Sequence, residues 1–439
     1  MSRLVDLESG VVSREVFVGE DVYRQEQRQV FARAWLFIGH ESQVPNPGDF
    51  FVSRMGEESV ILTRDRQRRL HVFLNTCRHR GMKVCRYDEG NTTTFNCPYH
   101  GWSYGLEGEL VGIPAFKEGY HEQLDRTKWG LVEVPQLAVY KGSVWATWDA
   151  KAPPLLDYLG GMRFFLDLLL DCRDGREGGS EVLGGVQKWQ VPCNWKFGAE
   201  NFVGDAYHAI SHRSVDSVGI APSGGKGRTD RESSSDRRYS VSFEGLGHGT
   251  NATIQPFPEP FTPIFRNLPH LEDYFREAYE RRQRRHGELS RILGGAATIF
   301  PNTSFQPRQP RSIAVWHPRG PCQAEFWRFY LVDADAPQEL KDYLSRYHAS
   351  ALGPGGMTEQ DDMENWVYAT AASRGEIARR YPYSYEMGMG FEMTADDIPS
   401  LPGATISNVP SEKNQRAYYR RWMEFMDGKS WDELMATAG

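Results

Sequence analysis

The chain has 439 residues, of which 25% are charged and 40% are hydrophobic, and its formal net charge at pH 7 is −7. This composition predicts a globular protein of about two or three domains, because one hydrophobic core rarely organises so long a chain. The acidic balance argues against nucleic acid as the main partner, since no basic stripe is available to neutralise phosphates. No apolar stretch reaches the about 18 residues of a membrane span, and six cysteines do not suggest a disulfide scaffold, so we expect a cytoplasmic protein.

The predicted elements change in kind along the chain. Residues 14–36 favour a helix, because apolar side chains recur among Glu, Gln and Arg. Residues 37–152 carry short β-rich runs separated by turns, which favours a small all-β domain. Residues 153–439 mix strands and helices, which favours an α+β fold with an antiparallel sheet. We therefore predict an N-terminal helical segment, residues 1–36, that packs on the last of these domains.

The strongest chemical signal lies inside the predicted β domain. Cys77-Arg78-His79-Arg80-Gly81 is followed by Cys97-Pro98-Tyr99-His100-Gly101-Trp102, so each of two short loops carries one cysteine and one histidine. Zinc with two Cys and two His is one interpretation, based on ligand count. Zinc fingers, however, use pairs of cysteines and pairs of histidines. One of each in each loop suits a [2Fe–2S] cluster in which the cysteines hold one iron and the histidines hold the other.

A second group of candidate ligands lies in Glu200-Asn201-Phe202-Val203-Gly204-Asp205-Ala206-Tyr207-His208-Ala209-Ile210-Ser211-His212. On a helix, His208 and His212 share one face, and Asp205 lies one turn before His208. Two such imidazoles can bind one metal, and Asp205 can then hold a ring N–H of His208. Helical histidine pairs are also common in packing and on surfaces, so this pair alone leaves the metal site undecided.

A mononuclear iron that activates O₂ needs a carboxylate beside two histidines, with open positions left for dioxygen. The segment Glu359-Gln360-Asp361-Asp362-Met363-Glu364 offers four carboxylates, and the residues alone do not choose among them. An acidic, solvated helix start is the alternative interpretation, and it applies well to Glu359 and Glu364.

Together, these motifs resemble the large subunits of Rieske non-haem iron oxygenases. The first pair of loops is similar to the C-x-H-R-G … C-P-Y-H-G-W form of ring-hydroxylating oxygenases. Asn194-Trp195-Lys196 and the run from Ala199 to His208 resemble the catalytic domain of the naphthalene and biphenyl dioxygenases, and the resemblance covers essentially the whole chain. It implies a helix-grip (START-like) catalytic domain, one [2Fe–2S] Rieske cluster and one mononuclear Fe(II).

The resemblance also assigns site residues. It implies that Cys77, His79, Cys97 and His100 hold the cluster, and that His208, His212 and Asp362 hold the mononuclear iron. Asp205 is expected to bridge between His100 of a neighbouring subunit and His208, and Asn201 to belong to the catalytic site. Many relatives place four residues between the two iron histidines, whereas three intervene here. Either the helix is more regular here, or the second ligand has slipped by one position.

The implied reaction adds O₂, two electrons and two protons across an aromatic double bond and yields a cis-dihydrodiol. The resemblance also implies that the electrons come from NAD(P)H through a separate reductase and ferredoxin, and the lack of a strand-to-helix G-x-G-x-x-G motif agrees with this. A small beta subunit in an α₃β₃ hexamer is also implied. The candidate pocket residues are mostly apolar, and small ones among them favour a bicyclic or larger ring. They are Phe202, Val203, Ala209, Gly294, Ala296 and Thr358.

Two alternatives remain open at this point. Arg308 and Arg311 follow a predicted strand and could reach a carboxylate, which favours a monooxygenase or hydroxylase acting on an aromatic carboxylate. Surface charge at a strand end is the simpler interpretation of both arginines. A pure electron-transfer Rieske protein is the other alternative, and the second set of candidate metal ligands argues against it.

Overall fold

The computed structural model describes residues 4–171, 179–205, 207–217, 238–254, 269–308, 311–392, 401–408 and 410–436. The chain forms two compact units. The first, which we call the β unit, contains Phe31–Ala152. The second, which we call the mixed unit, combines Met1–Val30 with Pro153–Gly439. The first thirty residues therefore fold with the C-terminal part of the chain and not with the segment that follows them directly.

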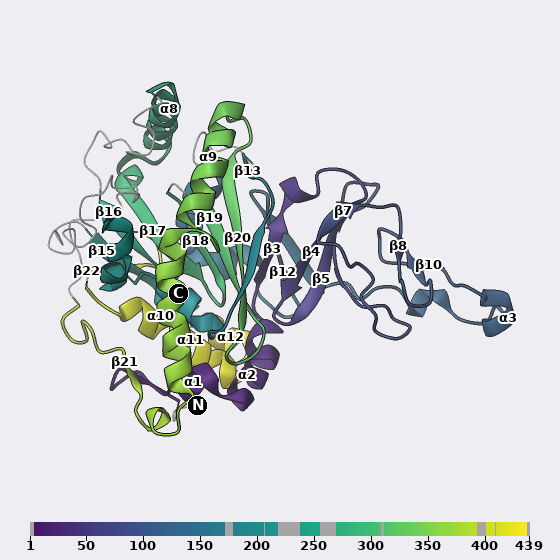
Figure 1. Cartoon of the computed structure of the whole chain (residues 1–439), viewed down its shortest axis with the longest axis horizontal. Helices are drawn as coiled ribbons and strands as arrows, with labels where there is room; N and C mark the ends of the chain where they lie inside the picture. The colour runs from purple at the N-terminus through teal and green to yellow at the C-terminus, as the bar shows by residue number, and fades with distance from the viewer. Residues whose placement is uncertain are drawn as a thin grey trace. The chain divides into compact units, whose positions relative to one another are not determined.

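The β unit consists of short antiparallel strands, drawn in purple and blue in Figure 1. They are β3 (Leu36–His40), β4 (Asp49–Met55), β5 (Glu58–Arg64), β6 (Leu70–Leu74), β7 (Glu89–Asn91), β8 (Phe95–Asn96), β9 (Ser103–Tyr104), β10 (Leu110–Gly112), β11 (Gln136–Tyr140) and β12 (Ser143–Thr147), with one short helix, α3 (Phe116–Tyr120). Three sheets result, with the orders β11–β12–β3, β6–β5–β4–β7 and β10–β9–β8. Phe50, Ile61 and Phe73 form a core with Cys77 and Cys97, so the predicted cluster loops are anchored in this core.

One antiparallel sheet organises the mixed unit (Figure 1). Its strands are β13 (Ser180–Val182), β14 (Gln187–Val191), β15 (Arg238–Phe243), β16 (His248–Ile254), β17 (Ile292–Ile299), β18 (Thr303–Gln306), β19 (Ser312–Pro318), β20 (Ala324–Asp333) and β22 (Thr405–Asn408). Among the described residues the order is β13–β20–β19–β18–β17–β16–β15–β22, and β14 also pairs with β20. Every residue of β19 is buried, which explains the apolar run at its centre, residues 313–316. The observed fold is therefore α+β with antiparallel sheets, as predicted.

Helices cover this sheet and carry the chemistry. They are α4 (Leu155–Leu159), α5 (Arg163–Leu170), α6 (Trp195–Phe202), α7 (Arg213–Ser217), α8 (Pro269–His286), α9 (Gln338–Ala351), α10 (Met357–Ser373), α11 (Lys413–Met426) and α12 (Trp431–Ala436). Asn194 caps α6 by accepting the N–H of Lys196 at 3.0 Å. Gly198 lets α6 approach β19 closely, because a Cβ there would lie 2.5 Å from the ring of Trp316. Leu340 and Leu344 pack α9 against β20 through Val332.

The predicted single helix at residues 14–36 is wrong. The segment contains α1 (Glu15–Val18), α2 (Glu20–Glu26) and a π-helical turn at Gln27–Phe31, and β3 starts at Leu36. Gly19 breaks the helix because its backbone is extended, with φ −76° and ψ 123°. Strands β1 (Val5–Asp6) and β2 (Val11–Val12) precede these helices and form a small sheet with β21 (Tyr383–Ser384).

Glu26 fixes this N-terminal segment to the mixed unit. Its carboxylate and the ammonium of Lys196 on α6 are both fully buried and lie 2.5 Å apart. The indole N–H groups of Trp195 and Trp422 donate to the same carboxylate at 3.0 and 2.8 Å. One buried acid thus joins α2, α6 and α11, and its charge is compensated by a cation and two donors.

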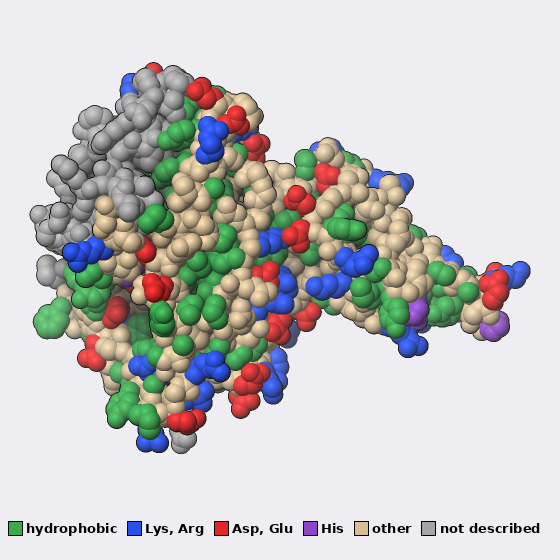
Figure 2. All heavy atoms as spheres, viewed as in Figure 1, with side chains coloured by type: hydrophobic (Ala, Val, Ile, Leu, Met, Phe, Trp, Pro, Cys, Tyr) green, Lys and Arg blue, Asp and Glu red, His purple; other side chains and the backbone are tan. Residues whose placement is uncertain are grey.

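The described surface is mixed in charge. On the face shown in Figure 2, acidic and basic side chains are interspersed and do not gather in large patches of one sign. Within the described ranges, no helix combines the length and the apolar character needed to cross a membrane.

Candidate metal centres

Two loops of the β unit bring four predicted ligands together, namely Cys77, His79, Cys97 and His100. One loop follows β6 and the other joins β8 to β9. Both close with the same backbone bond, from Gly81 N–H to the Cys77 carbonyl at 2.9 Å and from Gly101 N–H to the Cys97 carbonyl at 3.0 Å. The two glycines have φ values of +72° and +75°, which residues with a Cβ rarely adopt. The glycines of both motifs are therefore explained by the turns that present the ligands.

The side chains of these loops are sorted by burial. Cys77 and Cys97 are 2% and 3% exposed, whereas His79 is half-buried and His100 is exposed. The two imidazole centroids lie 4.5 Å apart. The hydroxyl of Tyr104 lies 3.3 Å from Sγ of Cys77. Two buried thiols and two outward imidazoles match a [2Fe–2S] cluster held by cysteines on one iron and histidines on the other.

The imidazole of His79 has two properties expected of a metal ligand, a ring nitrogen without a hydrogen-bond partner and a lowered pKa. Its Nδ1 is buried and has no hydrogen-bond partner in the described part of the chain, although buried polar atoms are normally paired. Burial, with a contribution from the positive charges of His100 and Arg80, lowers the pKa of His79. A lowered pKa favours the neutral imidazole that binds metals. These residues therefore fit the cluster that the motif predicts.

The second centre begins where α6 ends. Gly204 has φ +131°, and a Cβ there would lie 2.6 Å from Nδ2 of Asn414 on α11. That amide donates to the carbonyls of Val203 at 2.8 Å and Thr250 at 3.1 Å. The close approach requires glycine, and the two bonds hold the end of the helix. The chain is therefore fixed in position directly before Asp205.

The prediction of a regular α-helix through His208 and His212 is wrong, because the helix there is of the 3-10 kind. Residues Tyr207–His212 form a 3-10 helix, because α6 has already ended and Asp205 starts a new segment. Oδ1 of Asp205 accepts the N–H of Tyr207 at 2.8 Å and that of His208 at 3.3 Å. The two imidazoles still face each other, with centroids 5.2 Å apart. A spacing of three intervening residues thus brings both rings together without an α-helix.

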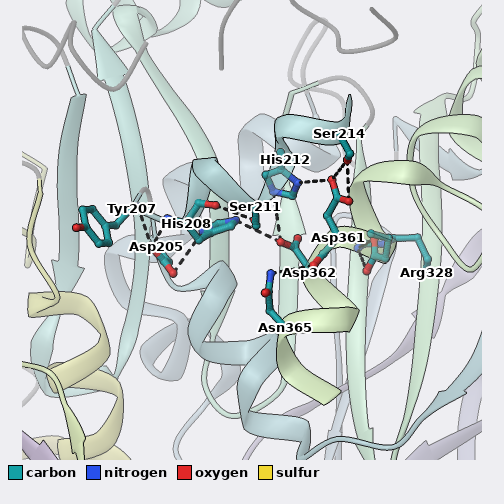
Figure 3. Close-up of polar contacts among 11 residues, drawn as sticks. Asp205, Tyr207, His208, Ser211, His212, Ser214, Arg328, Asp361, Asp362 and Asn365 are labelled. Carbon is teal, nitrogen blue, oxygen red and sulfur yellow. Dashed lines mark hydrogen bonds and ion pairs between the residues drawn. The ribbon is translucent and has the colours of Figure 1, made fainter. Parts of the chain in front are cut away.

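His208, His212 and Asp362 converge, and Figure 3 shows their polar ends pointing toward one another. Nε2 of His208 lies 3.5 Å and Nε2 of His212 lies 3.3 Å from Oδ1 of Asp362. One possible ligand atom from each residue lies within 4.8 Å of the other two. The side chains of His212 and Asp362 are 6% and 10% exposed, whereas that of His208 is 28% exposed. Two imidazoles and one carboxylate on one side match a facial iron site with positions left for dioxygen.

Asp205 lies at the opposite nitrogen of His208. Its Oδ2 is 3.3 Å from Nδ1 of the ring, which orients Nε2 toward Asp362. Burial opposes the anion of Asp205. The hydrogen bonds from His208 and from the backbone N–H of Tyr207 outweigh this penalty and hold the pKa of Asp205 below its usual value. Asp205 is therefore a carboxylate at neutral pH and can accept an imidazole N–H.

Asp361 supports the second histidine in a similar way, and the sequence did not distinguish its role from that of Asp362. Oδ2 of Asp361 lies 3.5 Å from Nδ1 of His212. The hydroxyl of Ser214 donates to both oxygens of Asp361, at 2.8 and 2.7 Å. Asp361 therefore lies at Nδ1 of the His212 ring, and Asp362 lies at Nε2 of the same ring (Figure 3).

Phe202 and Val203, predicted to line the pocket, lie at the end of α6. They are 5% and 0% exposed. The ring of Phe202 packs against Trp316 of β19, with centroids 5.2 Å apart. Ala209 lies in the 3-10 helix, and its side chain is outside the described residues.

The other predicted pocket residues lie on β17 and α10. Gly294 and Ala296 belong to β17, and Thr358 lies in the first turn of α10. A Cβ at Gly294 would lie 2.7 Å from the ring of Phe165. This glycine accommodates that ring, so its missing side chain does not by itself enlarge the site. The pocket assignments stay predictions.

Asn201, predicted to be catalytic, is 9% exposed on the last turn of α6. Its carbonyl accepts the N–H of Asp205 at 3.1 Å, so its backbone helps to fix that carboxylate. The role of the Asn201 side chain stays a prediction.

Glu200 is a notable acid that the sequence did not single out. It accepts the hydroxyl of Tyr385 at 2.8 Å and that of Tyr419. Burial raises the pKa of Glu200 to about 7, and the charges of Asp205 and Glu412 act in the same direction, although the two tyrosines lower it. The sequence around Glu200 does not predict these hydrogen bonds or the raised pKa, because both tyrosines come from distant segments of the chain.

Neither strand-end arginine is a free carboxylate receptor. Nη1 of Arg311 lies 2.8 Å from Oδ1 of Asp333, and the arginine is 3% exposed. Nε of Arg308 donates to the carbonyl of Gly294 at 3.1 Å, and its side chain is exposed. The expectation that either one reaches a carboxylate substrate therefore has no support in their contacts.

Comparison with known proteins agrees with both centres. Residues 34–140 match the family described as the Rieske [2Fe-2S] domain, and residues 176–428 match the ring hydroxylating alpha subunit (catalytic domain). The biphenyl dioxygenase alpha subunit of Paraburkholderia xenovorans is 39% identical, over 98% of this chain and 94% of that protein. The benzene 1,2-dioxygenase alpha subunit of Pseudomonas putida is 38% identical, over 99% and 95%.

A solved structure shows the same fold. Naphthalene 1,2-dioxygenase from Rhodococcus sp., bound to indole, superimposes with a TM-score of 0.82 and 35% sequence identity, and the match covers 97% of this chain and 98% of that one. The matched families require one Rieske cluster and one mononuclear iron, and the residues described above fit both groups. The chain therefore belongs to the alpha subunits of the aromatic ring-hydroxylating dioxygenases, with a Rieske [2Fe–2S] domain and a mononuclear iron domain.

Proposed function

We propose that this chain is the terminal oxygenase subunit that cis-dihydroxylates an uncharged aromatic hydrocarbon of two or more rings. The observation that carries the proposal is the convergence of His208, His212 and Asp362, with Asp205 on the second nitrogen of His208. When bound, the cluster supplies electrons and the mononuclear iron supplies oxygen activation. The residues of the chain hold these groups, keep the imidazoles oriented and bury the substrate beside Phe202.

We assign the residues as follows. Cys77, His79, Cys97 and His100 hold the cluster, and His208, His212 and Asp362 hold the mononuclear iron. Asp205 orients His208 and forms the bridge toward the cluster of a neighbouring subunit. Its lowered pKa favours the anion, which can accept the ring N–H of His208.

The partners follow from the division of labour in such systems. Relatives of this chain are named as alpha subunits, which supports a small beta subunit as partner. We propose an α₃β₃ hexamer that receives electrons from NAD(P)H through a reductase and a ferredoxin, in the cytoplasm. Light scattering on the co-purified subunits tests the stoichiometry, and a mass far from that of a hexamer contradicts it.

A single-turnover experiment tests the reaction without the reductase and the ferredoxin. The cluster is reduced chemically, biphenyl or naphthalene is added, and ¹⁸O₂ is admitted to the anaerobic enzyme. We expect a cis-dihydrodiol that carries two ¹⁸O atoms from one O₂ molecule. A product with one ¹⁸O atom supports a monooxygenase, and cluster oxidation without any oxygenated product supports an electron carrier.

The second candidate, a monooxygenase acting on an aromatic carboxylate, finds no support in Arg308 and Arg311. Arg311 is paired with Asp333, and Nε of Arg308 donates to the carbonyl of Gly294. The same ¹⁸O₂ experiment with benzoate in place of biphenyl tests this candidate directly.

A further inference from the structure

A buried cation lies beside the predicted substrate site. Arg328 on β20 is 0% exposed. Its guanidinium carbon lies 5.3 Å from the ring centroid of Phe202 and 5.7 Å from that of Trp316. Phe202 is also one of the predicted pocket residues. The substrate side of α6 therefore has a positive group behind its aromatic surface.

Glu359 neutralises this cation. It lies in the first turn of α10 and is 2% exposed. Nη2 of Arg328 lies 2.6 Å from Oε1 of Glu359 and also contacts Oε2. A buried guanidinium normally requires such a partner, because an unpaired charge in the interior is strongly destabilising. The pair also ties α10 to β20, and Glu359 lies three residues before Asp362 on the same face of the helix.

The guanidinium is not saturated by these contacts. Nη1 donates to the hydroxyl of Ser312 at the long distance of 3.4 Å. Nε is buried without a hydrogen-bond partner among the described residues. Arg328 thus has donors to spare, and a carboxylate is the group that best matches a guanidinium. Among the described residues, Glu359 is the anion paired with Arg328, and its charge offsets the attraction of the guanidinium for a second anion.

The other strand-end arginines do not compete for this role. Arg311 is paired with Asp333, and Arg308 is exposed. Among these three arginines, Arg328 is the one whose guanidinium packs on a predicted pocket ring. Of the three, Arg328 is therefore the cation that adjoins the predicted pocket.

We propose that the Arg328–Glu359 pair determines the charge selectivity of the substrate site, so that Glu359 makes the enzyme favour uncharged aromatic rings over aromatic carboxylates. Selectivity of this kind arises when an attractive group is cancelled and the unwanted ligand is left without a partner for its charge. The inference rests on the proposed function and deepens it, because it names the residues that exclude aromatic acids.

Three variants and a matched pair of ligands test the proposal. The variants are Glu359→Gln, Arg328→Gln and the double variant. The ligands are biphenyl and biphenyl-4-carboxylate, which differ only by the charged group. Binding is measured anaerobically by calorimetry and by tryptophan fluorescence, since Trp316 lies beside Arg328. Iron and sulfide contents are determined for each variant, so that binding is compared only between proteins with both centres intact.

We expect Glu359→Gln to tighten carboxylate binding at least tenfold, because the guanidinium loses its internal anion. Arg328→Gln is expected to weaken carboxylate binding further, at least fivefold, because Glu359 then stands alone. The double variant is expected to return the ratio of the two affinities to within about threefold of the wild-type value. The two single variants are expected to change carboxylate affinity in opposite directions, whereas a loss of structure would weaken binding in both. If one single variant does not fold, the affinity ratio of the other still tests the proposal.

An unchanged affinity ratio in a folded single variant overturns the proposal, and so does an equal carboxylate gain in the double variant. The outcome is distinguishable from failure of the proposed function. If the wild type does not bind biphenyl, the proposed function fails and this inference fails with it. If the wild type binds biphenyl and the affinity ratio does not move in the variants, only the role of Arg328 and Glu359 fails.

Discussion

The two metal centres are built in different ways. The cluster ligands lie between Cys77 and His100, on two loops that close with the same backbone bond. The mononuclear site joins His208 and His212 on a 3-10 helix with Asp362 on α10, far along the chain. The first centre therefore needs only a small β core and local turns. The second depends on tertiary packing that brings α10 to the end of α6.

This difference predicts different sensitivities. The cluster loops are anchored by their own glycines and by a core within the β unit. The iron site is supported by side chains from several elements, among them Asp205, Asp361 and Asn414. Substitutions distant from the ligands are expected to disturb the iron site more than the cluster.

Asp362→Ala should give the largest effect and separates the two centres directly. The variant should lose one iron per chain and keep the two irons and two sulfides of the cluster. Turnover should fall to background, while the visible spectrum of the cluster is unchanged. Metal and sulfide analysis measures this. Asp361→Ala is the matched control and should retain more of the mononuclear iron than Asp362→Ala, because Asp361 contacts Ser214 and the outer nitrogen of His212 and is not assigned as a ligand. Loss of the cluster with Asp362→Ala would contradict the independence of the centres.

Glu26→Gln tests whether long-range packing supports the mixed unit. It leaves the buried ammonium of Lys196 without its anion, and removing one partner of a buried pair costs about 3–5 kcal/mol. Denaturant unfolding followed by tryptophan fluorescence should show this loss, while cluster absorbance reports the β unit separately. Glu20→Gln removes an exposed partner of Arg24 and should change stability by less than about 1 kcal/mol. Equal losses of unfolding free energy in the two variants would contradict the prediction that the buried pair stabilises the mixed unit more than the exposed pair.

Asp205→Ala should impair electron transfer from the cluster to the mononuclear iron and leave both centres intact. We expect the full iron and sulfide content but a loss of about 10–100-fold in coupled turnover, because His208 loses its orienting anion. The measurement is product formed per electron delivered. Ser211→Ala removes a nearby hydroxyl that donates to the carbonyl of His208, and it should remain active. Normal turnover of Asp205→Ala would disprove the bridge.

The smallest effect concerns pH and Glu200. Because its folded-state pKa of about 7 lies above the usual value of 4.5, the folded protein binds more protons than the unfolded chain between these pH values. The stability contribution of this group is therefore complete below about pH 4.5 and is lost as pH rises through 7, with a slope of at most about 1.4 kcal/mol per pH unit.

Glu200→Gln removes that slope. The difference between the stability curves of wild type and variant, measured by urea unfolding from pH 5 to 8, should change across this window and then level off. Lys196, Asp205, Glu412 and the tyrosines Tyr383, Tyr385, Tyr418 and Tyr419 also interact electrostatically with Glu200, and they are unchanged in the variant. Parallel curves for the two proteins would mean that Glu200 is ionised in the folded state throughout this range.

The sequence predicted what is local. The cysteine and histidine loops were recognisable because ligand spacing and turn glycines lie within one short segment. The break at Gly19 and the 3-10 turn after Gly204 were not predicted, because the periodicity of apolar residues does not report a single backbone change. The residues alone did not separate the roles of Asp361 and Asp362, since adjacent carboxylates differ only in which side of the helix reaches His212, and the family resemblance selected Asp362.

Interactions between distant segments escaped prediction for a related reason. Glu26 with Lys196 and Arg328 with Glu359 are ordinary surface residue types, and burial alone makes them important. A single sequence contains no periodicity that pairs residues so far apart. The antiparallel sheet, in contrast, followed from runs of β-rich residues, because each strand carries its own signal.

Asn414 illustrates how far the influence of one amide can extend. It donates to Val203 at the end of α6 and to Thr250 on β16, and the close fit of Gly204 depends on it. Asn414 lies on α11, 211 residues after Val203, so this helix is synthesised long after α6 and yet completes the turn that leads into the first iron histidine. During translation, the iron site should stay incomplete until α11 has left the ribosome. Premature stop codons before α11 should accordingly yield protein with a sound cluster domain and no stable iron site.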